Sequence, residues 1–513
     1  MTCPFAVCGL TLFFVMLALS FLPGVRYAAA AGAVFFVLLV CGLLHRKSRK
    51  AGYLPFACCG ALLGCLLLIA FCTLQQQPAL SFVRTRDVLV CGARDYPRPN
   101  SRGNRLLVTA KVTLEDGTRV PGCVQLSLPR HETDACNFAS DVEPGDTIRF
   151  TGPLYALGGD NASVVRSFQS RSLFLGSYPV LNGSLQKNAR PSPYMRLLRL
   201  RRDMIRTLQR SFLPDQASLL TAVLFGDKSQ MSDALYDAFR RAGAAHIMAV
   251  SGMHLSAWVF FLLWLWKKRT RNLQTAGGVL LLVVLAVMAL AGFSGSVLRA
   301  GLMMGVYLVG LLLRRRPDGL NSLGFAALVI LCVRPGFCMH VGFILSVLST
   351  LAILTFALPI TQQIDRVITR RVRTQPLDRW LSAAAASVCI SVCVTVVTLP
   401  VQIASFGAVS LVTVLTNLLL LPFLLPLLLL GGLFLLLHAV PVFGTVLRFL
   451  CEGVARYCIR IAKTMAALPY ASLTLPKSAA AWAAVLTAAF CLAFLALRLK
   501  KRRLDLFEDF SII

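Results

Sequence analysis

Two histidines and a serine interrupt a strongly apolar stretch in the middle of the chain, directly after a pair of arginines. The stretch contains His246, Ser251 and His254, and it follows Arg240 and Arg241. Ionisable side chains are costly at membrane depth, so they usually face protein or a water-filled path. On an unbroken helix, Arg240, Ser251 and His254 would fall within about 60° of one another. A polar stripe on one helix face favours an aqueous conduit. Hydrogen bonds to neighbouring helices would equally explain why these polar residues lie in an apolar stretch.

Two other chemistries use the same residues. Ser251 and His254 are three positions apart, a spacing at which a nucleophile and its base can meet, but Asp237 is the only acidic residue nearby to orient the histidine. A metal site would need a further acidic or cysteine ligand at the same depth, and none is evident. We therefore expect no catalytic residue, no metal and no cofactor.

The surrounding composition is that of a membrane protein. Hydrophobic residues make up 57% of the 513 residues, charged residues 14%, and the net charge is +30. Soluble globular proteins carry about 25% charged residues. The apolar content also excludes a disordered chain. Basic clusters at 46–50, 267–271, 314–316, 366–373 and 498–503 separate apolar runs, as cytoplasmic loops do.

Apolar runs near the length of a bilayer span set the organisation. They lie at 4–22, 27–44, 54–74, 243–266, 275–293, 297–313, 322–336, 340–359, 382–403, 408–437, 442–466 and 479–498. These runs predict a polytopic α-helical protein of the cytoplasmic (inner) membrane, with about 12 spans and both termini inside. Pro422 and Pro426 leave open whether 408–437 is one span or a re-entrant pair.

Residues 75–190 are polar and strand-like. Segments 108–114 and 124–128 alternate between apolar and polar residues, and Asp116-Gly117 between them suits a hairpin turn. We expect a small β domain outside the membrane. The predicted domains are N-terminal spans (1–74), this β domain (75–190), a basic helix (191–215), a membrane domain (216–498) and a cytoplasmic tail (499–513).

The segment 191–215 has the pattern of a basic amphipathic helix. Arg196, Arg199, Arg202 and Arg206 interleave with apolar residues. Such a helix binds anionic lipid, DNA phosphates or both. Positive charge is normally concentrated on the cytoplasmic side, so an outward position weighs against lipid alone.

Other residues have a structural interpretation beside the functional one. In the β domain, Arg166, Phe168 and Arg171 suit base stacking with phosphate contact, or a solvated basic face. Cys123 and Cys136 are candidates for a disulfide, because that side of the membrane is oxidising. Asp227 suits a loop or helix cap, and Asn417 a hydrogen bond between helices. Arg299 would line a path for phosphates or extend to the outer surface.

Several segments together resemble ComEC-type competence proteins, the inner-membrane DNA channels of natural transformation. They are FGD at 225–227, DAFRRAGAAHIMAVSGMHLS at 237–256, GFSGSVLRA at 292–300, RRRPDGLN at 314–321, PGFCMHVGF at 335–343, TLPVQ at 398–402, FG at 406–407 and TNLLLLP at 416–422. The segment EPGDTIRFTG at 143–152 resembles the family's OB-like domain.

The resemblance implies a channel for single-stranded transforming DNA, in a short form without the C-terminal metallo-β-lactamase-like domain of many members. It implies partners beyond DNA and lipid: a DNA receptor, a separate nuclease, a cytoplasmic DNA-translocating ATPase and possible further copies of the chain. It places Asp227, Arg240, Arg241, His246, Ser251, His254, Arg299 and Asn417 along the path. A secondary transporter of a small organic anion and an intramembrane serine hydrolase remain the alternatives.

Overall fold

The structure is a computed structural model of the chain. It describes residues 4–20, 25–44, 53–83, 88–99, 105–129, 141–157, 172–180, 183–188, 192–269, 273–315, 317–371, 375–476, 478–491 and 494. The chain divides into two compact units. The first comprises Met1–Arg210, Phe225–Gln230 and Val250–Ile344. The second comprises Ser211–Leu224, Met231–Ala249 and Leu345–Ile513.

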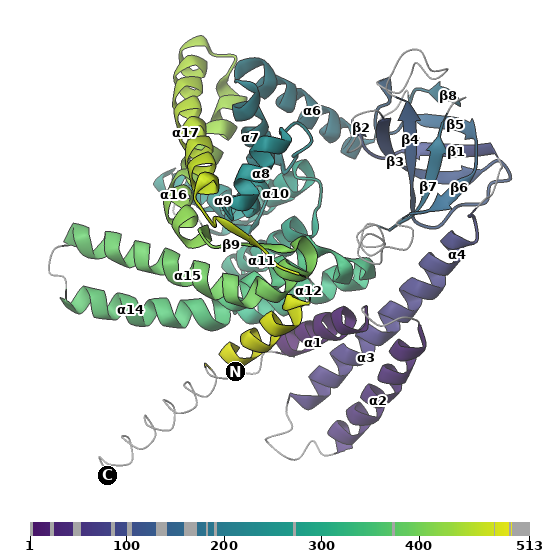
Figure 1. The fold of residues 1–513 in the computed structure, drawn as a ribbon, viewed down its shortest axis with the longest axis horizontal. Helices are drawn as coiled ribbons and strands as arrows, with labels where there is room; N and C mark the ends of the chain where they lie inside the picture. Colours follow the sequence, from purple (N-terminus) through teal and green to yellow (C-terminus); the bar gives the residue numbers. More distant parts are fainter. Residues whose placement is uncertain are drawn as a thin grey trace. The chain divides into compact units, whose positions relative to one another are not determined.

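The first unit begins with helices that pack at close range (Figure 1). They are α1 (Pro4–Leu19), α2 (Val25–Leu44), α3 (Leu54–Phe71), the π-helical turn η2 (Cys72–Gln76) and α4 (Gln77–Leu80). Helix α1 packs against α3 and against α12 (Gly319–Val333). A Cβ on Gly9 would lie 1.9 Å from the carbonyl oxygen of Gly324, so this crossing requires glycine. The Asn321 Oδ1 accepts hydrogen bonds from the N–H groups of Phe5 and Ala6, which have no partner within a helix.

A β domain follows in the same unit, and it confirms both predicted strands and the turn between them. Its strands are β1 (Val88–Ala93), β2 (Arg98–Pro99), β3 (Arg105–Leu114), β4 (Cys123–Pro129), β5 (Thr147–Thr151), β6 (Leu154–Ala156), β7 (Leu173–Pro179) and β8 (Gly183–Gln186). The sheet order is β6-β7-β4-β3-β1-β5-β8. Strands β4 and β7 are parallel and the other pairs are antiparallel. Only Gly152 and Pro153 separate β5 from β6, so the pairing returns from β7 through β6 and β5 to β1.

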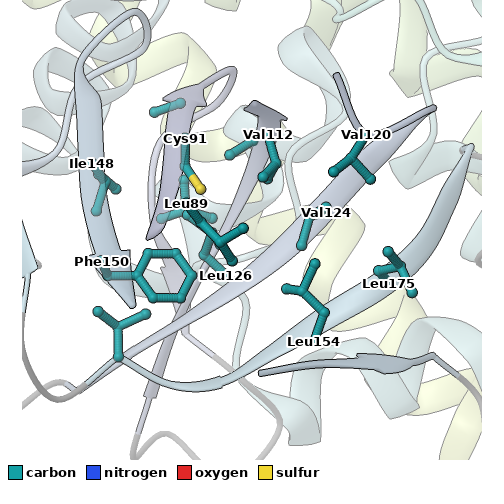
Figure 2. Packing of buried hydrophobic residues seen from close by; sticks show 14 of the residues in the cluster. Leu89, Cys91, Val112, Val120, Val124, Leu126, Ile148, Phe150, Leu154 and Leu175 are labelled. Carbon is teal, nitrogen blue, oxygen red and sulfur yellow. The ribbon is translucent and has the colours of Figure 1, made fainter. Parts of the chain in front are cut away.

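The core of the β domain lies on the inward side of these strands. Figure 2 shows apolar side chains from β1, β3, β4, β5, β6 and β7 pointing toward one another. Leu89, Leu126 and Ile148 are fully buried there. Because side chains alternate between the two faces of a strand, the alternation in the sequence places one apolar set in this core. Burying apolar surface stabilises the domain by about 25 cal/mol per Å².

The rest of the first unit is helical. It consists of α6 (Pro193–Ser211), α9 (Gly252–Arg269), α10 (Leu273–Leu290), α11 (Gly295–Leu312), α12, the short helix η5 (Pro335–Met339) and the start of α13 (Val341–Ala352). Helices α9, α10 and α11 pack on one another around an apolar cluster that includes Val259, Val284 and Val297.

The second unit contains the other long helices. Its elements are α7 (Pro214–Phe225), α8 (Asp233–Arg241), the 3₁₀ turn η4 (Ala245–Met248), η6 (Ile353–Ala357), α14 (Leu358–Arg371), α15 (Gln375–Phe406), β9 (Ala408–Ser410), α16 (Thr413–Leu437), α17 (Pro441–Ala467) and β10 (Ser472–Thr474). Strand β9 pairs with β10. Helix α16 continues through Pro422 and Pro426. The region 408–437 is therefore a short strand followed by one helix, and the re-entrant pair is wrong.

Within the described residues, five helical segments are long and apolar enough to cross a membrane. They are Leu54–Leu80, Gly295–Leu312, Val341–Arg370, Asp378–Phe406 and Thr413–Leu437. Shorter apolar helices lie at Pro4–Leu19, Ala276–Leu290, Gly319–Val333 and Ala479–Cys491. These helices support the predicted class, a helical membrane protein.

The packing of the β domain yields a stability prediction. Leu126→Ala would leave a cavity among fully buried neighbours and lower the free energy of unfolding of this domain by about 2–5 kcal/mol. Limited proteolysis of the full chain in detergent should then show faster cleavage within 88–186. Tyr178→Ala is the control, because that side chain is 55% exposed. Equal cleavage of the two variants would contradict the proposed core.

Candidate functional site

Helix α6 forms the predicted basic amphipathic surface. Leu198 and Leu208 lie on its buried face, while Arg196 and Arg206 are exposed. The Arg206 guanidinium lies 3.8 Å from Asp203 on the same helix, and both side chains are more than half exposed. An exposed pair of this kind contributes little to stability. Arg196 has no ion-pair partner among the described residues. These two arginines are therefore accessible to an anionic partner.

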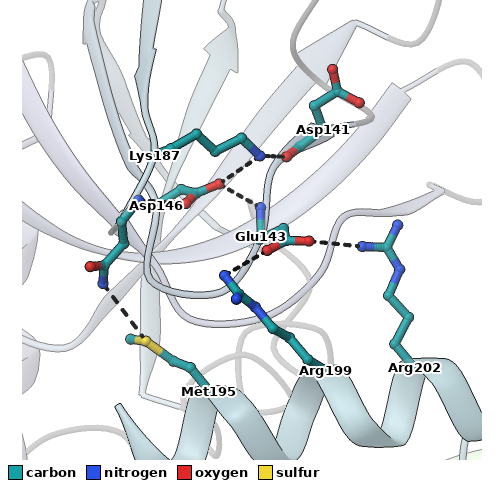
Figure 3. A network of polar contacts seen from close by, with 8 residues as sticks. Asp141, Glu143, Asp146, Lys187, Met195, Arg199 and Arg202 are labelled. Atoms are coloured by element: carbon teal, nitrogen blue, oxygen red, sulfur yellow. Dashed lines mark hydrogen bonds and ion pairs between the residues drawn. The ribbon is translucent and has the colours of Figure 1, made fainter. Parts of the chain in front are cut away.

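The other two predicted DNA-binding arginines on α6 contact a carboxylate. Figure 3 shows Arg199 and Arg202 reaching from the helix to Glu143. The Arg199 guanidinium lies 2.8 Å from Glu143, and that of Arg202 lies 3.7 Å from it. Arg202 also lies over the ring of Tyr96, 4.5 Å from its centroid, as in a cation–π contact. The four arginines predicted as equivalent thus form two pairs, one exposed and one bound to the β domain.

The loop that carries Glu143 is itself fixed. The backbone N–H of Glu143 donates to Asp146, whose carboxylate is buried and lies 3.1 Å from the Lys187 ammonium. The Lys187 ammonium also donates to the carbonyl of Asp141 (Figure 3). A buried carboxylate requires such partners, because an unpaired charge away from water is costly. Glu143 is thereby held where Arg199 meets it.

Asp227, in the segment FGD, pairs with α6 as well. Its carboxylate lies 3.5 Å from the Arg201 guanidinium, which also donates to the carbonyl of Phe225. The Asp227 Oδ1 accepts from the backbone N–H of Ser229, as in a loop cap. Burial raises the pKa of Asp227, but Arg98, the Ser229 hydrogen bonds and Arg201 together lower it below its ordinary value. Asp227 therefore stays ionised at neutral pH and ties this loop to α6.

The unbroken helix expected to carry Arg240, Ser251 and His254 is wrong. Ser232 begins α8, with its hydroxyl accepting from the N–H of Leu235, but α8 ends at Arg241. Gly243 follows with φ of 75°, and a Cβ there would lie 2.0 Å from the Thr413 Oγ1. The 3₁₀ turn η4 comes next, and α9 begins only at Gly252.

The predicted stripe is thus divided between two helices. Arg240 lies on α8, where it pairs with Asp237 at 3.1 Å, and Arg241 is exposed beside it. His246 is exposed on η4. Ser251 and His254 belong to the start of α9, in the other compact unit. The helical arithmetic therefore gives no common face for Arg240, Ser251 and His254.

Ser251 and His254 form a local motif at the start of α9. The His254 Nδ1 accepts from the backbone N–H of Ser251 at 3.2 Å and lies 3.0 Å from the Ser251 hydroxyl. A side chain three residues into a helix that bonds back to the preceding N–H is half of a capping box. His254 is 2% exposed, whereas Ser251 is partly exposed. The same contact has the reach of a nucleophile–base pair.

Arg299 is buried and lines a pocket in the first unit. It lies on α11 and is 7% exposed, so it does not extend to the surface. The pocket has a volume of about 280 Å³ and is lined on one side by Gly252, Ser256 and Phe260 of α9. A Cβ on Gly252 would lie 3.4 Å from the Arg299 Nη2. A guanidinium at a pocket wall suits an anionic group.

Asn417 makes the predicted contact between helices. Its Nδ2 donates to the Ser391 hydroxyl at 3.1 Å, which joins α16 to α15, and both residues are buried. Such bonds between membrane helices contribute about 1 kcal/mol. Asn417 thus acts in packing in this unit.

Some predicted residues lie outside the described part of the chain. Arg166, Phe168, Arg171 and Cys136 are among them, together with the tail 499–513. Cys123 is buried, and its Sγ accepts from Arg94 at 3.3 Å. Its pairing with Cys136 stays a prediction. Within the described ranges, no group of three or more His, Cys, Asp or Glu side chains is placed to hold a metal ion.

One set of charged residues was not predicted from the sequence. The apolar run 442–466 predicts an ordinary span, yet α17 carries Arg448, Glu452, Arg456, Arg460 and Lys463. The spacing of four residues was visible in the sequence, and it places these side chains along one helix face. More than two charges in any 18-residue stretch keep α17 out of the candidate spans.

The capping interpretation of His254 can be tested by substitution. Glutamine three residues into a helix also accepts the N–H of the capping residue, whereas leucine does not. His254→Leu should lower the thermal unfolding midpoint of the purified protein in detergent, by the equivalent of about 1 kcal/mol. His254→Gln should retain most of the stability. Equal losses in the two variants would exclude a capping role.

Comparison with known proteins identifies the family. A model of the competence protein family matches residues 223–500. The chain is 26% identical over 286 residues to ComE operon protein 3 of Bacillus subtilis (strain 168), which covers 55% of this chain. The chain spans about a third of the length of that relative (34%). No solved structure matches. The family match covers the segment 237–256, the signature, which lies on α8, η4 and the start of α9, and it continues through the helices that follow. The chain therefore belongs to the competence protein family of membrane proteins.

Proposed function

We propose that the protein is a channel that passes single-stranded DNA inward across the cytoplasmic membrane during natural transformation. Membership of the competence family supports a role in DNA uptake. The observation that carries the proposal is α6, which presents Arg196 and Arg206 outward while three other arginines hold it to the β domain and the Asp227 loop. Exposed cations held in place beside a polar domain can bind a polyanion such as DNA.

The β domain is proposed to be OB-like. The pairings β1–β3, β3–β4, a parallel β4–β7 pair and a return to β1 through β6 and β5 support this assignment. OB folds bind single strands with basic grooves and aromatic platforms. Tyr155 and Tyr178 are exposed on adjacent strands, with ring centroids 5.1 Å apart. They would offer such a platform in place of residues outside the described ranges.

The proposed topology keeps about 12 spans, with the β domain and α6 outside and both termini inside. The domain boundaries predicted from the sequence go with this topology. The chain would pass the strand without covalent chemistry. Driving force and strand degradation would come from partners, namely a DNA-translocating ATPase and a nuclease, with a DNA receptor outside and possible further copies of the chain.

An intramembrane serine hydrolase remains a second candidate, because the Ser251 hydroxyl lies 3.0 Å from the His254 Nδ1. A triad also needs a carboxylate that orients the histidine, and Asp237, the acidic residue expected to do so, pairs with Arg240 on α8. A transporter of a small organic anion would use Arg299 as the counter-charge in its pocket. Substitutions of the signature residues separate these candidates from the channel.

The proposed role of α6 predicts two opposite effects on DNA binding. Arg196→Gln with Arg206→Gln should weaken binding of a single-stranded oligonucleotide by the full chain in detergent. The slope of log Kd against log salt should become shallower by about 0.7 for each phosphate that the protein no longer neutralises. Glu143→Gln should strengthen binding, because it frees Arg199 and Arg202 for phosphates. Fluorescence anisotropy over a salt series measures both effects.

Glu115→Gln is the matched control for Glu143→Gln, since it removes the same charge from an exposed position on the β domain. It should raise the affinity less. If the double arginine variant binds as tightly as the wild type at low salt, α6 serves the lipid surface instead.

DNA entry itself tests the signature residues. Deletion of the gene should abolish transformation by naked DNA. Arg240→Ala and His254→Leu should abolish DNA entry at normal membrane abundance and normal surface DNA binding. Ser251→Ala should be milder, because removing one hydrogen bond costs about 1 kcal/mol. His254→Gln separates function from stability, since it retains the cap but removes the imidazole.

If the protein is a serine hydrolase, the expected order of the variants differs: Ser251→Ala should reduce activity as severely as His254→Leu. It also predicts that Ser251 reacts with a serine-specific probe. Normal transformation in both Arg240→Ala and His254→Leu would remove the signature segment from the path. Normal transformation in the deletion strain would contradict the proposed function as a whole.

A further inference from the structure

Helix α17 carries a row of charges that has no part in the candidate site on α6. Arg448, Glu452, Arg456 and Arg460 follow at intervals of four residues, and Lys463 comes three residues later. Four of these five side chains are positive. Successive members are about 6 Å apart along the helix axis. Arg456, Arg460 and Lys463 are exposed on the C-terminal half.

A neighbouring face of α17 is buried, with its members running from Gly444 to Ala466. Small residues from Gly444 through Ala455 to Ala466 lie on this face. The helix packs against α8 and against α16, one of the candidate spans. Small residues allow membrane helices to approach closely. This close packing indicates that α17 lies alongside α16 rather than flat on the membrane surface.

Two contacts set the level of the charges relative to α16. The Tyr457 hydroxyl donates to the carbonyl of Leu419 at 3.4 Å, and its ring lies 4.2 Å from that of Phe423. Arg456 and Arg460 therefore lie beside the first turns of α16, which begins at Thr413. An ionisable side chain at the depth of a membrane span is costly and usually marks a path for a polar substrate.

The charges of α17 differ in their partners. Arg448 lies 3.0 Å from Glu452, and Lys463 lies 3.0 Å from Asp215. Arg456 and Arg460 are exposed and make no ion pair within the part of the chain that the structure describes. In the proposed topology they lie in the outer half of the membrane. This runs against the usual concentration of positive charge on the inside, so topology alone does not explain them.

The surface of α17 changes along its length. The N-terminal half exposes large apolar side chains, such as Val442, Phe443 and Phe449, as a lipid-facing helix does. The C-terminal half exposes Arg456, Arg460 and Lys463, whereas Arg448, the arginine of the N-terminal half, pairs with Glu452. A membrane lipid would offer one headgroup phosphate at one depth, whereas the cations extend over two turns. A chain of regularly spaced phosphates matches that extension better.

We infer that the exposed face of α17 from Arg456 to Lys463 binds successive phosphates of the DNA strand at the outer end of its path. This inference rests on the proposed channel function and adds a binding surface within the membrane domain. Arg456 and Arg460 would supply the free charges.

The test compares charge removal with charge retention. Arg456→Gln with Arg460→Gln should lower the transformation frequency at least tenfold at wild-type membrane abundance. Arg456→Lys with Arg460→Lys should retain most of the activity, because lysine also neutralises phosphate. Arg448→Gln is the matched control on the same helix face and should stay within about twofold, since its charge already has a partner.

A second measurement distinguishes DNA from lipid. The full chain in nanodiscs of phosphatidylcholine should bind a single-stranded oligonucleotide less tightly when both arginines are glutamine. Unchanged affinity together with weaker retention of phosphatidylglycerol would overturn the inference in favour of a lipid site. If deletion of the gene abolishes transformation while the double glutamine variant transforms normally, the inference fails and the channel function stands. If deletion of the gene has no effect on transformation, the proposed channel function is contradicted, and this inference, which rests on it, is contradicted as well.

Discussion

The architecture depends on one electrostatic constraint: a chain with a net charge of +30 must place many cations beside apolar surroundings. A charge removed from water needs a partner or a water-filled path. In the described residues, carboxylates supply several of these partners. Glu143 takes Arg199 and Arg202, Asp227 takes Arg201, and Asp215 takes Lys463. Other cations remain exposed, among them Arg196 and Arg206 on α6 and Arg456 and Arg460 on α17.

Helix α6 shows how this constraint connects structure to function. Its arginines point in different directions, because a helix turns by 100° per residue. One set holds the β domain through Glu143, a second holds the Asp227 loop, and a third stays exposed. The contacts that fix the helix therefore also fix the direction of its free charges. A binding surface held in this way loses little conformational entropy when a ligand binds.

Local patterns made much of the fold predictable. The alternation in 108–114 and 124–128 corresponds to β3 and β4, and Ser232 begins α8 as its capping preference suggests. The contact of Asn417 with another helix followed from its polarity in an apolar run. Each of these features depends on residues close in sequence or on a side chain that must find a partner. The span count and the OB-like assignment depend on more than local pattern, so they stay proposals.

The sequence by itself determined the membrane class, the β domain, the basic helix and the family, because hydropathy, alternation and motif order are local properties. Tertiary structure decided which charges are free. Glu143 pairs with Arg199 and Arg202 from a loop that its N–H bond to Asp146 and the Asp146–Lys187 pair hold in place. Helix α8 ends after Arg241 in a local turn, in which Gly243 has φ of 75° and the Ala244 N–H donates to the carbonyl of Phe239, so the single helix expected to join Arg240 to His254 does not form. Tertiary structure decided that only glycine fits in this turn, because a Cβ on Gly243 would collide with Thr413, 170 residues away in the chain, and a contact over such a separation leaves no signal in local spacing.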